Sequence, residues 1–170
     1  MIMSGHMLRE IRPVEPFHER TCHNGLTFGV GPAGYDVRID QDILLEPGGF
    51  ALASTMEYFT MPKDLLGIVH DKSTWARLGL AAQNTVIEPG WHGFLTLELT
   101  NHNPRPGWLR RWRKRPPGTI VIERGTAIVQ VVFHRLDTAS EGYAGKYQGQ
   151  KRGPQPAILG ADGPRFRPRN

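Results

Sequence analysis

The segment at residues 70–77 combines cations and hydroxyl groups that could bind a phosphate. Lys72, Ser73 and Thr74 lie where a short helix is expected to begin. Helix-terminal amides, hydroxyl groups and a positive charge together suit an anionic ligand. The alternative is a charged, capped turn at the surface, and the residue types alone leave both interpretations open.

One carboxylate interrupts the apolar run at residues 94–99. Leu95, Leu97 and Leu99 would share one face of a strand and fill a core, which puts Glu98 on the opposite face. Glu98 is then either a solvated surface carboxylate, the usual state of glutamate, or a general acid/base in a cleft.

Two further segments could hold a ligand. Residues 86–93 form a turn rich in Gly and Pro that contains Trp91. The flat ring of Trp91 would lie under a sugar or base, or it would fill the core. Residues 146–154 combine cations, amides and a tyrosine without core residues. This segment is either a disordered basic tail or a lid that closes on an anionic ligand.

Short strands must position these residues. The 20 glycines and 14 prolines among 170 residues favour many strands joined by turns. One short helix is expected at residues 73–78, with Asp71 or Ser73 as its cap and Gly79 at its end. Alternating or apolar runs predict strands at residues 35–39, 50–58, 65–69, 93–100, 120–122 and 127–136.

This pattern predicts an all-β fold, a distorted β-barrel or jelly-roll-like sandwich with one short helix. The length fits a single domain over residues 1–170. Residues 1–34 give no clear pattern. Residues 137–170 are polar and rich in Gly and Pro, which predicts a tail that is ordered only against something else.

Cysteine content and hydropathy narrow the class of protein. The lone Cys22 cannot form an intrachain disulfide, which favours a reducing compartment. It also cannot supply the Cys-x-x-Cys pair of zinc deaminases, so we expect no zinc. The sequence has no apolar run long enough to span a membrane and no signal-peptide core, which predicts a cytoplasmic protein without a membrane partner.

The net charge of +5 comes from one loop. Six Lys and Arg residues lie between Arg105 and Arg115, more than the whole positive excess, and Trp108 and Trp112 lie among them. We interpret residues 102–118 as a solvated hairpin insertion. A contact with nucleic acid or a protein partner is the less favoured alternative, since cations interleaved with aromatic rings suit single strands.

Taken in order, these segments resemble the dCTP deaminase branch of the dUTPase-like superfamily. The tail favours the deaminase branch because the glycine-rich C-terminal motif of true dUTPases is missing. The matches extend from about Tyr35 to Pro156 and comprise Lys72-Ser73-Thr74, Arg77-Leu78-Gly79-Leu80, Ile87-Glu88-Pro89-Gly90-Trp91, Leu97-Glu98-Leu99, Gln130 and Lys146-Tyr147-Gln148-Gly149-Gln150.

The resemblance implies a dUTPase-like homotrimer that deaminates dCTP to dUTP and ammonia. The pyrimidine deoxynucleoside triphosphate would bind between subunits, with Mg²⁺ on its phosphates. Glu98 would be the catalytic acid/base that activates water without a metal, and Arg77 would orient both. The remaining matched residues would bind substrate: Lys72, Ser73 and Thr74 at the phosphates, Trp91 at the deoxyribose, Gln130 from a neighbouring subunit, Lys146, Tyr147 and Gln150 in the lid, and Glu88 at the family's aspartate position.

The sequence departs from the family pattern at three places. Thr85-Val86 leads directly into Ile87-Glu88, which shortens the hairpin that would read the pyrimidine edge. Glu88 stands where the family has aspartate, and the turn after Asn101 is longer. These departures keep two alternatives open. One is a nucleotide diphosphatase that releases pyrophosphate, alone or after deamination. The other is a non-catalytic regulator that binds nucleotides.

Overall fold

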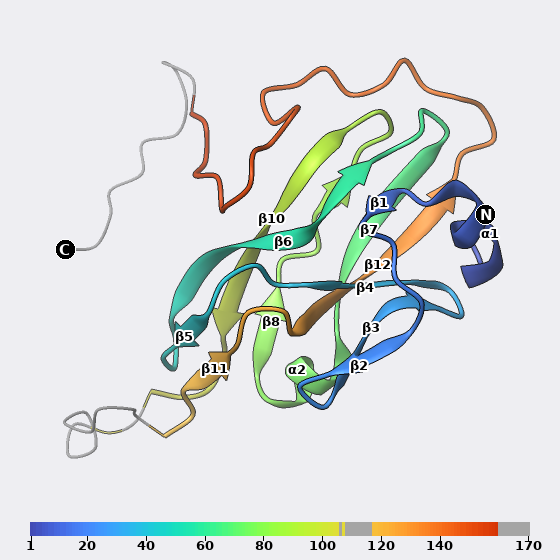
Figure 1. The fold of residues 1–170 in the computed structure, drawn as a ribbon. Helices are drawn as coiled ribbons and strands as arrows, with labels where there is room; N and C mark the ends of the chain where they lie inside the picture. The colour runs from blue at the N-terminus through green and yellow to red at the C-terminus, as the bar shows by residue number, and fades with distance from the viewer. Residues whose placement is uncertain (106, 108–116, 160–170) are drawn as a thin grey trace.

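The computed structural model describes residues 1–105, 107 and 117–159. Most of the regular secondary structure in this part of the chain is β-strand (Figure 1). The strands are β1 (Val14–Glu15), β2 (Thr21–His23), β3 (Leu26–Gly31), β4 (Gly34–Arg38), β5 (Ile43–Leu45), β6 (Phe50–Thr60), β7 (Leu65–Asp71), β8 (Leu80–Ala82), β9 (Val86–Ile87), β10 (His92–Asn101), β11 (Ile120–Ile122) and β12 (Ala127–Arg135).

These strands form three sheets. The first has the order β1-β6-β10-β8, the second has the order β2-β3-β4-β12-β7-β9, and β11 pairs with β5. The strand pairs within the sheets are antiparallel. The predicted all-β fold is therefore confirmed, and each predicted strand is present, with ends that differ by at most two residues.

Two short helices accompany the sheets in the described part of the chain. Helix α2 (Ser73–Arg77) is the predicted one, whereas α1 (Gly5–Ile11) lies in the N-terminal region that showed no pattern. The Ser4 side chain accepts a hydrogen bond from the Met7 amide at the start of α1. Neither helix is long and apolar enough to cross a membrane.

The predicted cap of α2 is wrong. The N-cap is Lys72, and it makes no side-chain cap hydrogen bond. Strand β7 continues through Asp71, whose Oδ1 accepts a hydrogen bond from the Ala82 amide at 2.7 Å instead. Helix α2 is instead held by a contact with β12, because the buried Trp75 donates from Nε1 to the Ala127 carbonyl at 2.7 Å.

Strand β10 has the predicted alternation. Leu95, Leu97 and Leu99 are buried in the core, and Glu98 lies on the other face with intermediate exposure. Because one side of β10 is packed into the core, its register is firmly set, and the side chains of the opposite face are held in a fixed row.

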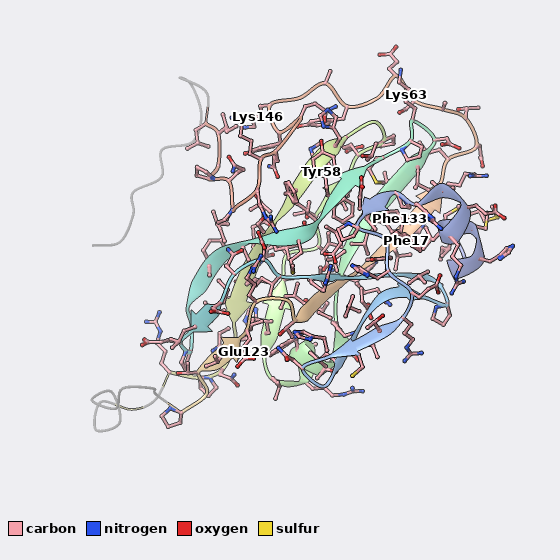
Figure 2. All side chains as sticks on the ribbon, in the orientation of Figure 1. Phe17, Tyr58, Lys63, Glu123, Phe133 and Lys146 are labelled. Atoms are coloured by element: carbon pink, nitrogen blue, oxygen red, sulfur yellow. The ribbon has the colours of Figure 1, made fainter. Side chains whose placement is uncertain are left out.

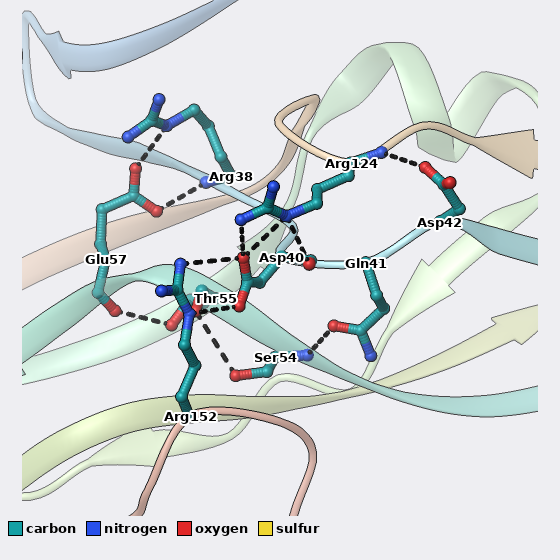
Figure 3. Close-up of polar contacts among 9 residues, drawn as sticks. All are labelled: Arg38, Asp40, Gln41, Asp42, Ser54, Thr55, Glu57, Arg124 and Arg152. Carbon is teal, nitrogen blue, oxygen red and sulfur yellow. Dashed lines mark hydrogen bonds and ion pairs between the residues drawn. The ribbon is translucent and has the colours of Figure 1, made fainter.

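A bulge in β6 lies opposite the middle of β10. Three residues of β6, from Thr55 to Glu57, face the single residue Leu95 of β10. The buried Thr55 hydroxyl closes this irregularity, since it accepts from the Leu95 amide at 3.0 Å and donates to the Glu57 carbonyl at 2.8 Å. The bulge changes the local direction of β6, and the Glu57 side chain there pairs with Arg38 inside the fold (Figure 3).

Candidate active site

Glu98 has the environment of a chemically active carboxyl group. Its side chain is half-buried, and its Oε2 atom is buried without a hydrogen-bond partner among the described residues. Burial raises the pKa of the Glu98 carboxyl, and a backbone hydrogen bond only partly opposes this. An unsatisfied buried oxygen is costly, so this atom marks a place where water or a ligand group would be bound.

The hairpin between β8 and β9 lies beside Glu98. The Gln83 amide donates to the Glu98 carbonyl at 3.0 Å, and the Thr85 amide donates to the Gln83 carbonyl at 2.9 Å. The Thr85 hydroxyl is also buried without a partner among the residues described. The hairpin thus brings a second unsatisfied oxygen to the segment that is hydrogen-bonded to Glu98.

The C-terminal tail is ordered against β10. In Figure 1 the chain leaves β12 near α1, crosses above the ends of the strands and descends beside β10. The Gln150 carbonyl accepts from the Phe94 amide at 3.0 Å, and its Oε1 accepts from the Thr96 hydroxyl at 3.4 Å. Phe94 and Thr96 share the face of β10 that carries Glu98. The tail therefore covers the row in which Glu98 lies.

Trp91 holds the tail from inside the core. Its ring is 5% exposed and packs near Phe59, with 6.2 Å between ring centroids. Its Nε1 donates to the Tyr147 carbonyl at 2.7 Å. Within one chain Trp91 is thus a core residue that fixes the tail, and a contact with deoxyribose stays a prediction. Glu88, in the turn before Trp91, is exposed.

The side chains of Lys146 and Tyr147 are hydrogen-bonded to the backbone of Ile158. The Lys146 ammonium donates to the Ile158 carbonyl and lies 5.2 Å from the centroid of the Tyr147 ring. The Tyr147 hydroxyl accepts from the Ile158 amide at 3.1 Å. A hollow of about 330 Å³ is lined here by residues 146–151, Gln155 and Ile158. The predicted lid residues therefore surround one polar hollow.

The sequence analysis placed Gln148 in the matched tail motif but assigned it no role. Its Oε1 accepts from the His92 amide at 3.0 Å, and its Nε2 donates to the carbonyls of Gly90 and Tyr143 at 2.9 and 3.0 Å. The Nδ1 atom of His92 is hydrogen-bonded to the Tyr58 hydroxyl at 2.8 Å. Figure 2 shows Tyr58 at the same end of the molecule as Lys146. A glutamine in a glycine-rich segment gives no signal by itself, because its partners are backbone groups distant in sequence.

The predicted phosphate turn lies at α2. Ser73, Thr74 and Arg77 are exposed, whereas the Lys72 ammonium pairs with the Asp36 carboxylate at 2.5 Å. The other carboxylate oxygen of Asp36 is buried without a described partner. Gln130 on β12 lies opposite Asp36 on β4. Lys72 is therefore paired with a carboxylate that the sequence analysis did not single out, on the residue of β4 that stands opposite Gln130 in the strand register.

The predicted site residues fall into two groups. One consists of Glu98 and Trp91 with the tail, and the other consists of the α2 turn with Gln130. Within the described residues, no hydrogen bond or ion pair joins Arg77 to Glu98. Among residues 1–105, 107 and 117–159 of one chain, no hydrogen bond or ion pair links the two groups directly.

The basic loop lies largely outside the described residues. Arg105 is described and exposed, and its guanidinium lies close to Gly48, where an added Cβ would be 2.7 Å from Arg105 Nε. Residue 106 and residues 108–116 are outside the described part. A contact of this loop with nucleic acid stays the less favoured prediction.

Comparisons with known proteins agree with this architecture. Residues 32–136 match the family model described as dCTP deaminase-like. A dCTP deaminase of Paramagnetospirillum magneticum is 33% identical, over 81% of this chain and 86% of that protein. A dCTP deaminase of Gemmatimonas aurantiaca is 32% identical, over 85% of this chain and 90% of that protein.

Among solved structures, dUTPases share the fold. A dUTPase from phage phi11 of S. aureus has a TM-score of 0.58 and 21% identity, and the match covers 76% of this chain and 90% of that one. A mutant of a phi11 dUTPase, which coordinates a structural Mg(II) ion, has a TM-score of 0.58 and 19% identity, over 77% of this chain and 94% of that one. The family match covers more than half of the sequence, and the chain belongs to the dCTP deaminase-like family.

Proposed function

We propose that this protein is a dCTP deaminase, which converts dCTP and water to dUTP and ammonia with Glu98 as general acid/base. The observation that carries the proposal is the buried, unpartnered Oε2 of Glu98, on a carboxyl group whose pKa is raised by burial. The names of the similar proteins, dCTP deaminase in each case, support the choice of substrate.

The proposed chemistry uses one carboxyl group twice. Glu98 accepts a proton from water while the water oxygen attacks C4 of cytosine, and it passes this proton to N3. It then takes the proton of the new C4 hydroxyl and passes it to the amine, which leaves as ammonia while the C4 carbonyl of uracil forms. A raised pKa brings the carboxyl closer to the acidity that suits both steps at neutral pH. Arg77 would orient the carboxylate and the water.

The triphosphate needs cations and hydrogen-bond donors. We assign this binding to Lys72, Ser73 and Thr74, with Gln130, Lys146, Tyr147 and Gln150 as further contacts. The Lys72 ammonium would exchange part of its interaction with Asp36 for phosphate oxygens. Mg²⁺ would arrive on the triphosphate. In the described part of the chain no three His, Cys, Asp or Glu side chains form a metal cluster, so the ion would keep phosphate and water ligands.

The two groups of site residues also support an assembly. We propose a homotrimer in which the α2 turn and Gln130 of one subunit face the Glu98 half of another. The lone, exposed Cys22 suits the reducing cytoplasm, where we place the protein. Residues 1–170 would act as one domain.

The decisive experiment is incubation of the protein with dCTP, dUTP, dTTP and CTP in Mg²⁺. Ammonia, nucleotide products and pyrophosphate are measured separately. We expect ammonia and dUTP from dCTP and no ammonia from the other three nucleotides. Pyrophosphate without ammonia would contradict the proposal and would move the chemistry to Glu88. Binding without turnover would identify a regulator.

The pH dependence of deamination should report the raised pKa of Glu98. The ionised carboxylate accepts the proton from water, so kcat/KM should rise with pH and level off above the pKa of Glu98. The midpoint of this rise should lie above 4.5, the ordinary value for glutamate, since burial raises the pKa. Initial rates with dCTP across the acidic range measure it. A midpoint at or below the ordinary value would contradict this role.

A further inference from the structure

The Asp40 carboxylate, just beyond β4, forms ion pairs with two arginines (Figure 3). Its side chain is 10% exposed. Arg124 donates from Nε and Nη2 to Oδ1 at 3.0 and 2.9 Å. Arg152 donates from Nε to Oδ2 at 2.6 Å and from Nη2 to Oδ1 at 3.1 Å. Both oxygens of a largely buried carboxylate are thus occupied by charged donors, which form strong hydrogen bonds.

The two arginines come from different parts of the chain. Arg124 lies in the turn between β11 and β12, whereas Arg152 belongs to the C-terminal tail. Their side chains are equally exposed, at 55% each. The Arg152 guanidinium also lies 5.7 Å from the centroid of the Phe94 ring on β10. Of the two ion pairs on Asp40, the Arg152 pair is therefore the one that joins the tail to the rest of the fold.

The pair fixes the tail where it passes the row that contains Glu98. Two residues before Arg152, Gln150 accepts from the Thr96 hydroxyl at 3.4 Å. Three residues after Arg152, the Gln155 amide donates to the same hydroxyl at 3.0 Å. Thr96 is two residues before Glu98 on the same face of β10. Arg152 thus anchors the short loop whose two ends meet beside Glu98.

The charge on Asp40 supports this anchor at neutral pH. Burial by itself raises the pKa of the Asp40 carboxyl, but the hydrogen bonds from Arg152 and Arg124 outweigh burial and hold the pKa below its usual value. The carboxylate therefore stays ionised through the neutral range and remains a partner for the tail.

We propose that Asp40 and Arg152 are positioning residues, which hold tail residues 146–150 over the Glu98 half of the site so that the tail is preorganised for the triphosphate. The inference rests on the proposed function for its effect on dCTP. The geometric part, that Asp40 keeps the tail on the barrel, is independent of that function. Preorganisation lowers the entropic cost of binding an ionic ligand.

The test compares Arg152→Gln with Arg124→Gln, a matched control that removes the other arginine from the same carboxylate. Because the Arg152 side chain is more than half exposed, loss of its pair with Asp40 should change the equilibrium between the anchored and the released tail by at most roughly fivefold. We expect Arg152→Gln to raise KM for dCTP by about fivefold, with kcat within about twofold. Arg124→Gln should leave KM and kcat unchanged.

The sign of the effect of Asp40→Asn separates positioning from direct electrostatics. Loss of a negative charge near an anionic ligand would by itself lower KM. Loss of the tail anchor would raise KM, and we expect the rise. A lower KM in Asp40→Asn, or equal KM values in Arg152→Gln and Arg124→Gln, would overturn the proposal.

A readout without activity distinguishes the failure of this inference from the failure of the proposed function. Cleavage after Lys146 by trypsin, followed by mass spectrometry on the full chain without nucleotide, should be about fivefold faster in Arg152→Gln and Asp40→Asn than in the unmodified protein. Arg124→Gln should be cleaved at the unmodified rate. Equal cleavage in all four proteins would show that Asp40 and Arg152 do not hold the tail, even if dCTP is deaminated. Faster cleavage in Arg152→Gln and Asp40→Asn alone would support this role even if no deamination is found.

Discussion

Glu98→Gln should lower the rate of ammonia release from dCTP by about a hundred- to ten-thousandfold, the usual contribution of a positioned general acid/base. Glutamine keeps the size of the side chain but cannot accept the proton of the attacking water. The measurement is kcat for ammonia release at saturating dCTP and neutral pH. Direct hydrolysis of dUTP to pyrophosphate, if the protein has that activity, should not change.

The stability of this variant provides the control. Since burial raises the pKa of Glu98 in the folded state, ionisation of this carboxyl costs stability as pH rises through that pKa. Glu98→Gln should therefore melt at or slightly above the Tm of the unmodified protein at neutral pH, and the difference should shrink at lower pH. The exposed Glu46→Gln is a matched variant that should change neither rate nor Tm. Unchanged ammonia release by Glu98→Gln would contradict the assigned role.

The position of Glu98 could be predicted because strand parity is a local property. Three leucines at alternate positions of β10 require one buried face, and the acid between them must then lie on the other. The sequence left open whether that face is solvated. The answer depends on segments far along the chain, since Gln150 and the Gln83 hairpin both pack beside β10.

Other parts of the site could not be derived locally. The cation at Lys72 was predictable, but its partner Asp36 lies on another strand and is found only through the packing of β4, β12 and β7. The N-terminal region gave no pattern because β1 and β2 are short, β2 is exposed throughout, and β3 buries three consecutive residues instead of alternate ones. Such strands do not show the alternation by which a half-buried strand is predicted from sequence.

For Trp91 the sequence left two roles open, a surface for a sugar or base and a part of the core. A tryptophan in a turn supplies a flat surface in either case. The structure gives it 5% exposure and a hydrogen bond to the Tyr147 carbonyl. The indole thus links the core to the tail, a role that needs both an apolar ring and a donor.

Arg38→Met should destabilise the protein by about 3–5 kcal/mol, the usual cost of removing one partner from a buried ion pair. Glu57 is fully buried, and it accepts from Arg38 Nε at 2.8 Å and from the Arg38 amide at 2.8 Å. Methionine keeps the unbranched apolar stem of arginine but lacks the guanidinium, so it leaves this carboxylate without its counterion. Tm should fall by roughly 6–20 °C for a domain of this size, measured by thermal melting at neutral pH.

The pH dependence of this loss follows from Glu57. Burial raises the pKa of its carboxyl even though the hydrogen bonds from Arg38 lower it. Without the guanidinium that pKa should rise further, so Arg38→Met should lose most stability at high pH and recover part of it as pH falls and Glu57 is protonated. A loss that grows as pH falls would contradict this account.

A double variant separates the energetic role of Glu57 from the chemical role of Glu98. Arg38→Met with Glu57→Leu removes both charges, so its loss of stability should be well below that of Arg38→Met alone, and an equal or greater loss would show that the carboxylate is not the source of the cost. At temperatures far below its Tm the double variant should still deaminate dCTP. Both glutamates have a pKa raised by burial, but Glu57 is paired and Glu98 has a free oxygen. That free oxygen, rather than the raised pKa, distinguishes the carboxyl that can move protons from the one that holds the fold.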